Sequence, residues 1–209
     1  MKHKIDLHVH SRYSGDTNSD PEQTVLKAIE CGLHGLAFTE HYYYEASEHV
    51  EALIGKYGER IMIFRGVELS TEAGHCLVFG LNTDNLGLKG RPVEEVIETI
   101  VEHGGVAVPS HPFRGSTSMG DRVKKLKNIS AIEGYNGYSH YAQNSKAVKL
   151  AGSLDLPFTG GSDAHESHEV GACYTEFEKK VTYENFLQLL RSGKYKGYDT
   201  RKVSRGWVF

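Results

Sequence analysis

Three potential metal ligands alternate with apolar residues near the start of the chain. Asp6, His8 and His10 occupy every second position, with Leu7 and Val9 between them. Side chains alternate faces along a β-strand, so the three polar side chains are expected on one face and the two apolar ones in a packed layer. Imidazole nitrogen and carboxylate oxygen are good ligands for Zn²⁺, Mn²⁺ and Fe²⁺. The pattern predicts a metal-binding strand, and a half-exposed edge strand with unrelated histidines is the alternative.

The composition excludes several classes of protein. The 209 residues suit a single domain over residues 1–209, and a net charge of −3 provides no general attraction for nucleic acid. The three cysteines are far apart and form no C-x-x-C pair, which indicates reduced thiols. The N-terminus lacks a signal-peptide pattern, and no apolar run has the length of a membrane span. We therefore expect a cytoplasmic protein that does not bind membranes.

The rest of the chain alternates between strand and helix patterns. Apolar runs bounded by polar residues predict strands at about 4–9, 35–39, 61–64, 76–79, 106–109, 131–133 and 156–159. Helical spacing predicts helices that begin near Pro21, Ala46, Pro92, Asp121, Lys146 and Phe186. Strands followed by helices indicate a parallel sheet covered by helices, and short buried strands with polar ends favour a closed barrel. An α/β barrel with its site at the C-terminal ends of the strands is the predicted fold.

Potential ligands stand at the ends of six of these predicted strands. They are His8, His10 and Asp16, then Glu40 and His41, then Glu68, His75, His111, Asp163 and His165. A single histidine in such a place is more often structural than a ligand. Six successive strand ends that each deliver His, Asp or Glu instead predict one shared metal centre.

The segments that carry these residues resemble the signature of the PHP (polymerase and histidinol phosphatase) family. They are Asp6-x-His8-x-His10-Ser11, Thr39-Glu40-His41, Gly66-Val67-Glu68, Ser110-His111-Pro112 and Gly161-Ser162-Asp163-Ala164-His165. They occur in the order of the family and span residues 6–165. The resemblance implies a distorted seven-stranded (β/α)7 TIM-like barrel that holds two to three divalent metal ions, either Zn, Mn or Fe.

The resemblance also implies how the ligands are divided among the ions. The sets are His8, His10, Glu68 and Asp163 for one ion, Glu68, His75 and His111 for a second, and Asp16, His41 and His165 for a third. Glu68 would be a bridging carboxylate, which holds two cations about 3.5–4 Å apart. This chain reads Tyr13-Ser14-Gly15-Asp16 where many relatives resemble Tyr-Ser-Asp-Gly, and the spacing from Glu68 to His75 is short. At Asp16 and His75 the chain therefore departs from the family pattern.

Four further residues are expected to support this centre. Asp6 is expected to accept the N–H of a ligand histidine and so fix its tautomer, with a cap at the start of the strand as the alternative. Glu40, in Thr39-Glu40-His41, replaces the Asp of many relatives and is expected behind the ligands. Arg114 is expected to bind phosphate bidentately, with a surface arginine as the alternative, and Arg12 is a second candidate.

A centre of this kind suits the hydrolysis of phosphate esters. A metal-bridging water, its pKa lowered from 15.7 toward about 7, would supply hydroxide, and the cations would neutralise developing charge. If the third ion is weakly held, His41 or His165 is the expected general acid for the leaving alkoxide. We expect a phosphomonoesterase for a small molecule of the histidinol-phosphate, nucleotide or sugar-phosphate type.

Two other functions remain open at this point. One is a phosphodiesterase or exonuclease on short oligonucleotides or cyclic or dinucleotide phosphates, and the other is a metal-dependent binding module without catalysis. The scarcity of basic charge, with a net charge of −3, argues against long nucleic acid as a partner. The oligomeric state is not predicted.

Overall fold

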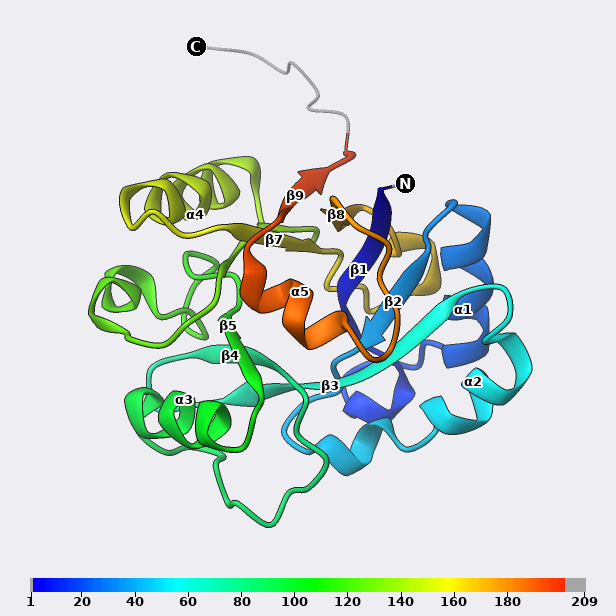
Figure 1. Cartoon of the computed structure of the whole chain (residues 1–209), viewed down its shortest axis with the longest axis horizontal. Coiled ribbons are helices and arrows are strands. Elements are labelled where there is room, and N and C mark those ends of the chain that lie inside the picture. Colours follow the sequence, from blue (N-terminus) through cyan, green and yellow to red (C-terminus); the bar gives the residue numbers. More distant parts are fainter. Residues whose placement is uncertain (1, 202–209) are drawn as a thin grey trace.

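A computed structural model describes residues 2–201 and contains nine strands and five α-helices in this range (Figure 1). The strands are β1 (His3–Val9), β2 (Gly35–Phe38), β3 (Met62–Ser70), β4 (His75–Phe79), β5 (Val106–Pro109), β6 (Ile132–Asn136), β7 (Phe158–Gly161), β8 (Cys173–Phe177) and β9 (Tyr195–Asp199). The helices are α1 (Pro21–Glu30), α2 (Val50–Tyr57), α3 (Val93–Glu102), α4 (Tyr141–Ser153) and α5 (Phe186–Ser192). Short 3₁₀ turns are η1 (Arg12–Ser14), η2 (Tyr44–Ser47), η3 (Gly120–Lys125) and η4 (Ser167–Glu169).

The strands form a mixed, curled sheet rather than an all-parallel barrel. Seven strands lie in the order β5-β4-β3-β2-β1-β8-β9, and β6 and β7 form a separate parallel pair. β1, β2 and β3 are parallel, whereas β4 is antiparallel to both of its neighbours and β8 is antiparallel to β1 and β9. The α/β class is confirmed. The strict (β/α)7 alternation is not found in residues 2–201, since β3 connects directly to β4 and no ladder joins β5 to β6.

The end of β7 closes the arrangement onto β1. The backbone N–H of Asp163 donates to the carbonyl of His8 at 2.7 Å, and the N–H of His10 donates to the carbonyl of Ala164 at 2.9 Å. A Cβ on Gly161 would lie 2.4 Å from the Cβ of His8, so this close approach of the two strands requires glycine. The segments that carry four of the predicted ligands are therefore fixed side by side.

The β3–β4 hairpin explains the position of His75. The turn is only four residues long, and Gly74 in it has φ 145°, with no space for a Cβ against the backbone of residues 117 and 119. So short a turn cannot hold a crossover helix, and β4 must run antiparallel to β3. The first residue of β4, His75, consequently lies at the rim where the parallel strands end.

Alternation along the strands separates an inner from an outer face. On β3, Phe64 packs inside with α5, whereas Val67 and Leu69 pack outside in the cluster beneath α3. Helix α5 thus fills the apolar end of the interior, near the centre of the view in Figure 1, and α1 and α2 cover another outer face. The other end of the interior holds the polar residues of the site.

The strict alternation predicted for β1 is wrong. The pairing of β1 with β2 shifts between Asp6 and Val9, as in a β-bulge. Leu7 therefore packs with the inner cluster around α5, whereas Val9 belongs to the outer cluster with α1 and α2. His8 and His10 reach the interior, but Asp6 does not share their face.

Within residues 2–201, none of the helices is both long and apolar enough to cross a membrane.

Candidate metal centre

The rim at the C-terminal ends of the parallel strands gathers potential ligands from six segments of the chain. Three groups have one potential ligand atom per residue within 4.8 Å of one another, and all are built from predicted ligands. The groups are His8, His10, Glu68 and Asp163; Glu68, His75 and His111; and His10, His41 and His165. Glu68 and His10 each belong to two groups, so the three form one continuous centre.

The first group is completely buried. The Nε2 atoms of His8 and His10 lie 3.1 Å apart, and both lie 3.2–3.4 Å from Oδ1 of Asp163. Each Nε2 is also 3.5 Å from a carboxylate oxygen of Glu68. Two imidazole nitrogens and two carboxylates that converge on one point match the ligand chemistry of a divalent cation.

The second group shares Glu68 with the first. Oε1 of Glu68 is 2.7 Å from Nε2 of His111 and 3.2 Å from Nδ1 of His75. The sequence suggested that Glu68 lies beyond the end of its strand. The structure places it within β3, because β3 continues to Ser70. Its position in mid-strand brings the carboxylate between the two groups, as a bridging ligand requires.

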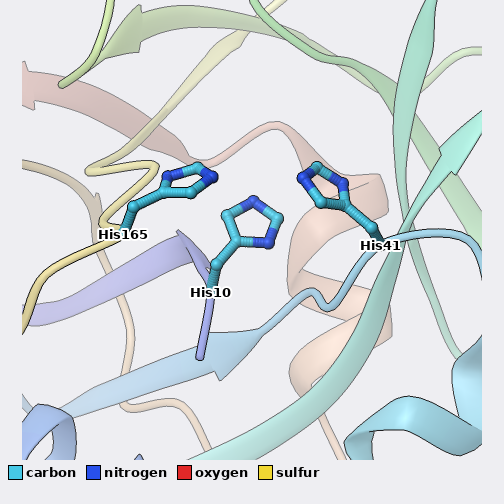
Figure 2. Close-up of side chains that lie close together, drawn as sticks. All are labelled: His10, His41 and His165. Carbon is cyan, nitrogen blue, oxygen red and sulfur yellow. The ribbon is translucent and has the colours of Figure 1, made fainter. Parts of the chain in front are cut away.

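The third group is the most accessible. Figure 2 shows the imidazoles of His10, His41 and His165 converging from three separate segments. Oδ2 of Asp16 lies 2.9 Å from Nε2 of His41 and 3.1 Å from Nε2 of His165. The structure thus brings Asp16, His41 and His165 together as predicted, and adds His10 to them.

Several buried ligand atoms of the centre have no hydrogen-bond partner among the described residues. They are Oε2 of Glu68, Oδ1 of Asp163, Nδ1 of His41 and Nδ1 of His75. A buried polar atom without a partner is costly, about 1–3 kcal/mol. These carboxylate oxygens and imidazole nitrogens can all offer lone pairs to a cation. Cations in the space between them would therefore satisfy them, so these residues fit divalent metal ions.

Charges within the centre shift the pKa values of its members strongly. Burial raises the pKa of a carboxyl group, yet the imidazole of His8, with other histidines nearby, holds the pKa values of Glu68 and Asp163 well below the usual range. Burial opposes a proton on His8, but Asp163, Glu133 and Glu68 raise its pKa well above the usual value. Burial lowers the pKa of His10 to about 4. Both carboxylates are thus ionised and ready to bind a cation.

Glu133, in β6, orients two of the ligands. Its Oε1 lies 2.8 Å from Nδ1 of His8, and its Oε2 accepts the backbone N–H of His111 at 2.8 Å. Asn136 donates to Glu133 at 3.1 Å and to Oδ2 of Asp163 at 2.9 Å. Neither residue was predicted from the sequence to belong to the site. Glu133 could have been found because it directly follows the apolar residues Ala131 and Ile132 in a strand. A charged residue that is buried there needs a partner.

The role predicted for Asp6 is wrong, because of the bulge in β1. Its carboxylate accepts backbone N–H groups of His8 at 3.3 Å, Ser162 at 2.8 Å and Gly171 at 2.9 Å, and it contacts no imidazole. Complete burial raises the pKa of Asp6 to about 6, although these N–H groups oppose the shift. Asp6 connects the β1 backbone to the segments after β7. Glu133, and not Asp6, contacts the ring of a ligand histidine.

Glu40 lies behind His10, as the sequence predicted. Oγ of Ser14 lies 2.8 Å from Nδ1 of His10 and donates to Oε2 of Glu40 at 2.5 Å. The hydroxyl and the backbone N–H of Ser11 also bond to Glu40, at 2.5 and 3.0 Å. Glu40 therefore fixes the orientation of the His10 ring through Ser14.

Two ligands have strained backbone conformations. His111 has φ 30° and Asp163 has φ 55°, in the left-handed region that non-glycine residues rarely adopt. Such residues cost about 1–3 kcal/mol each and persist where the surroundings fix them. Here the Glu133 bond to His111 and the β1 bond to Asp163 supply that fixation.

The centre opens into a cleft of about 620 Å³, and only one of the two predicted arginines reaches it. The cleft is lined by Asp16, His41, His75, Arg114, Thr117, Tyr138, His140, Gln143 and His165. Arg114 bonds to Asp163 and lies 2.9 Å from Nε2 of His111. Arg12 instead pairs with Asp20 on the exposed surface, where Asp20 caps α1. The prediction that Arg12 binds substrate is therefore not supported.

Comparison with known proteins places this geometry in a family. A family model described as PHP-associated matches residues 142–195. An uncharacterised protein of Methanocaldococcus jannaschii is 31% identical over 146 residues, which cover 65% of this chain and 82% of that protein. A histidinol-phosphatase of Lactococcus lactis is 23% identical over 184 residues, covering 74% of this chain and 65% of that one. The fold is similar to that of a lesion-specific endonuclease of Pyrococcus furiosus, with a TM-score of 0.69 at 21% identity over 94% of this chain and 57% of that one.

These matches agree with the motif order, the curled sheet and the shared His and carboxylate groups at its rim. The chain belongs to the PHP family of metal-dependent phosphoesterases.

Proposed function

We propose that this protein is a phosphomonoesterase that acts on a small-molecule phosphate ester. The observation that carries the proposal is the continuous centre in which Glu68 and His10 each serve two ligand groups beneath an open cleft. Divalent cations bound there would lower the pKa of a bound water and neutralise the charge of the phosphoryl group. Mixed imidazole and carboxylate ligands suit Zn²⁺, Mn²⁺ and Fe²⁺.

Residues of the cleft supply the remaining functions. The guanidinium of Arg114, next to Asp163 and His111, is placed to bind phosphate oxygens. His41 lines the cleft between the carboxylates of Asp16 and Glu68, at 2.9 and 3.1 Å, which favour a proton on its ring. His165 shares the contact with Asp16. If the third group holds no ion during turnover, His41, or His165 beside it, would protonate the leaving oxygen.

The charge of the cleft favours a small substrate. Arg114 is the one permanent cation among its lining residues, and the carboxylate of Asp16 lines the same cleft. A protein that binds along a nucleic-acid backbone neutralises several of its phosphates with lysine and arginine side chains. The size of the cleft falls in the range of small-molecule sites. The name of the histidinol-phosphatase relative indicates a small phosphomonoester as its substrate, which supports the same substrate class for this protein.

The test is the release of inorganic phosphate from a panel of monoesters, with Mn²⁺ supplied. The panel contains histidinol phosphate, nucleoside monophosphates, sugar phosphates and glycerol phosphate, and a nitrophenyl diester and a short oligonucleotide form a separate arm. Chelator and His111→Ala should both abolish release, whereas the matched variant His103→Ala, an exposed histidine at the end of α3, should retain it. Turnover of the diester arm alone by the metal-loaded protein would overturn the proposal.

A further inference from the structure

We propose that Tyr138 selects phosphate esters whose alcohol part carries a planar ring. This inference rests on the proposed function and adds a substrate class to it. Tyr138 follows β6 and lines the cleft, yet 61% of its surface is exposed. Among the residues that line this cleft it is the one aromatic side chain other than histidine.

The ring stands over the catalytic end of the cleft. Its centroid lies 5.6 Å from the centroid of His165 and 5.7 Å from Cζ of Arg114. A phosphate bound at Arg114 would therefore place the rest of its ester beside Tyr138. A flat group on that ester would stack on the tyrosine, whereas an aliphatic alcohol offers no face for stacking.

The loop that presents Tyr138 is fixed from the side of the metal centre. Oδ1 of Asn136 accepts the backbone N–H of Tyr138 at 3.0 Å and the hydroxyl of Ser139 at 3.1 Å. The amide nitrogen of the same Asn136 donates to the ligand Asp163 at 2.9 Å. Gly137 packs so closely on Ser162 that a Cβ would lie 2.3 Å from its carbonyl oxygen.

Arg201 fixes the loop from the opposite side. Its guanidinium donates to the carbonyl of Gly137 and, at 2.9 Å, to that of Ser139, which are the two neighbours of Tyr138. Asp199 holds Arg201 at 2.6 Å. Arg201 is thus a positioning residue for Tyr138.

An exposed ring on so constrained a loop is preorganised for a ligand. A loop backbone that is already ordered loses little entropy on binding, so stacking contributes more of its full value. Removal of an aromatic side chain that stacks on a nucleobase weakens binding by a factor of about 5 to 150. A nucleobase and an imidazole are both planar rings that meet this description.

The experiment compares kcat/KM for ring-bearing esters with kcat/KM for glycerol phosphate, using the metal-loaded protein. Nucleoside monophosphates and histidinol phosphate form separate arms, which distinguish a nucleobase from an imidazole. Tyr138→Ala should lower the ratio about 5- to 150-fold, mainly through KM, and Tyr138→Phe should retain it. Arg201→Gln should lower the ratio in the same direction, and Arg201→Lys should restore part of it.

The matched control is Tyr141→Ala. Tyr141 is 65% exposed and lies three residues further on, at the start of α4, but does not line the cleft. Its substitution should leave the ratio unchanged. Equal losses for ring and aliphatic esters in Tyr138→Ala, or an equal effect of Tyr141→Ala, would overturn the proposal.

Failure of the proposed function gives a different result. If the metal-loaded wild type releases no phosphate from any monoester, calorimetric binding of adenosine monophosphate replaces turnover as the readout. Binding that weakens at least 5-fold in Tyr138→Ala would support the ring subsite without the phosphatase. Absence of binding, or binding indifferent to Tyr138, would reject the subsite as well.

Discussion

Replacing Glu133 by glutamine should weaken metal binding without unfolding the protein. Glu133 is 1% exposed and its two oxygens meet three donors: the ring of His8, the backbone N–H of His111 and the amide of Asn136. Glutamine has nearly the same shape but only one oxygen. Its NH₂ group must face one of these donors, so at least one bond is lost, and the ionic partner of the His8 ring is removed.

The size of the effect follows from the bond that is lost. A hydrogen bond to a charged group contributes about 1.5–3 kcal/mol. Loss of that orientation energy corresponds to about a 10- to 150-fold weaker affinity at 1.4 kcal/mol per factor of ten. Outer contacts to metal-bound histidines in general contribute about 10- to 100-fold, which agrees.

The assay is competition for Zn²⁺ between the apoprotein and a chromophoric chelator. Near-ultraviolet circular dichroism shows whether the variant is folded, and Glu98→Gln, an exposed glutamate on α3, is the matched control. Folded Glu133→Gln protein with the affinity of the wild type would refute the reasoning, since it would show that the His8 ring needs no carboxylate to orient it.

Three further predictions test other parts of the centre. Glu68→Gln removes the ligand shared by two groups, so phosphate release should fall by more than about 100-fold and bound metal, measured by mass spectrometry, should also fall. Chelation should lower the melting temperature by about 5–10 °C, because metal at 100 times its Kd stabilises the fold by about 2.7 kcal/mol; an unchanged melting temperature would contradict metal binding. Burial, with Arg65 and Arg12 nearby, lowers the pKa of His49 to about 4, although Glu40 lies 3.5 Å away. This folded-state pKa lies below the value of about 6.5 in the unfolded chain. The contribution of His49 to the free energy of unfolding should therefore be full above pH 6.5 and fall toward pH 4. Urea unfolding of His49→Phe should accordingly show about 2 kcal/mol less loss between pH 7 and pH 5 than the wild type, and an identical loss would refute it.

The ligand residues were recognisable in the sequence because their chemistry repeats at strand ends. His8, His10, His111 and Asp163 follow short apolar runs, and the rule that parallel strands end at one rim brings them together. His75 lies at the same rim for a different reason, since it starts an antiparallel strand. The four-residue turn before it is too short for a crossover helix and so indicates an antiparallel strand.

The parts that were missed depend on backbone irregularity and on the tertiary surroundings. The bulge in β1 turns Asp6 away from the ligands. The alternation of polar and apolar residues in the sequence does not indicate such a shift in strand register. The β8–β9 hairpin was not predicted, although residues 173–177 alternate between buried and less buried positions as a strand does. The predicted helix near Asp121 is the 3₁₀ segment η3. The role of Glu133 could be assigned only once His8 and His111 were placed around it.

The central claim is that metal ions occupy the ligand groups joined by Glu68 and His10. Anomalous diffraction from crystals of the Zn²⁺-loaded protein, measured on both sides of the zinc absorption edge, tests it most directly. We predict peaks about 2.0–2.2 Å from the nearest nitrogen and oxygen atoms, with one on each side of Glu68 and about 3.5–4 Å between them. A well-ordered, Zn²⁺-loaded crystal with no anomalous peak in contact with Glu68 would contradict the account.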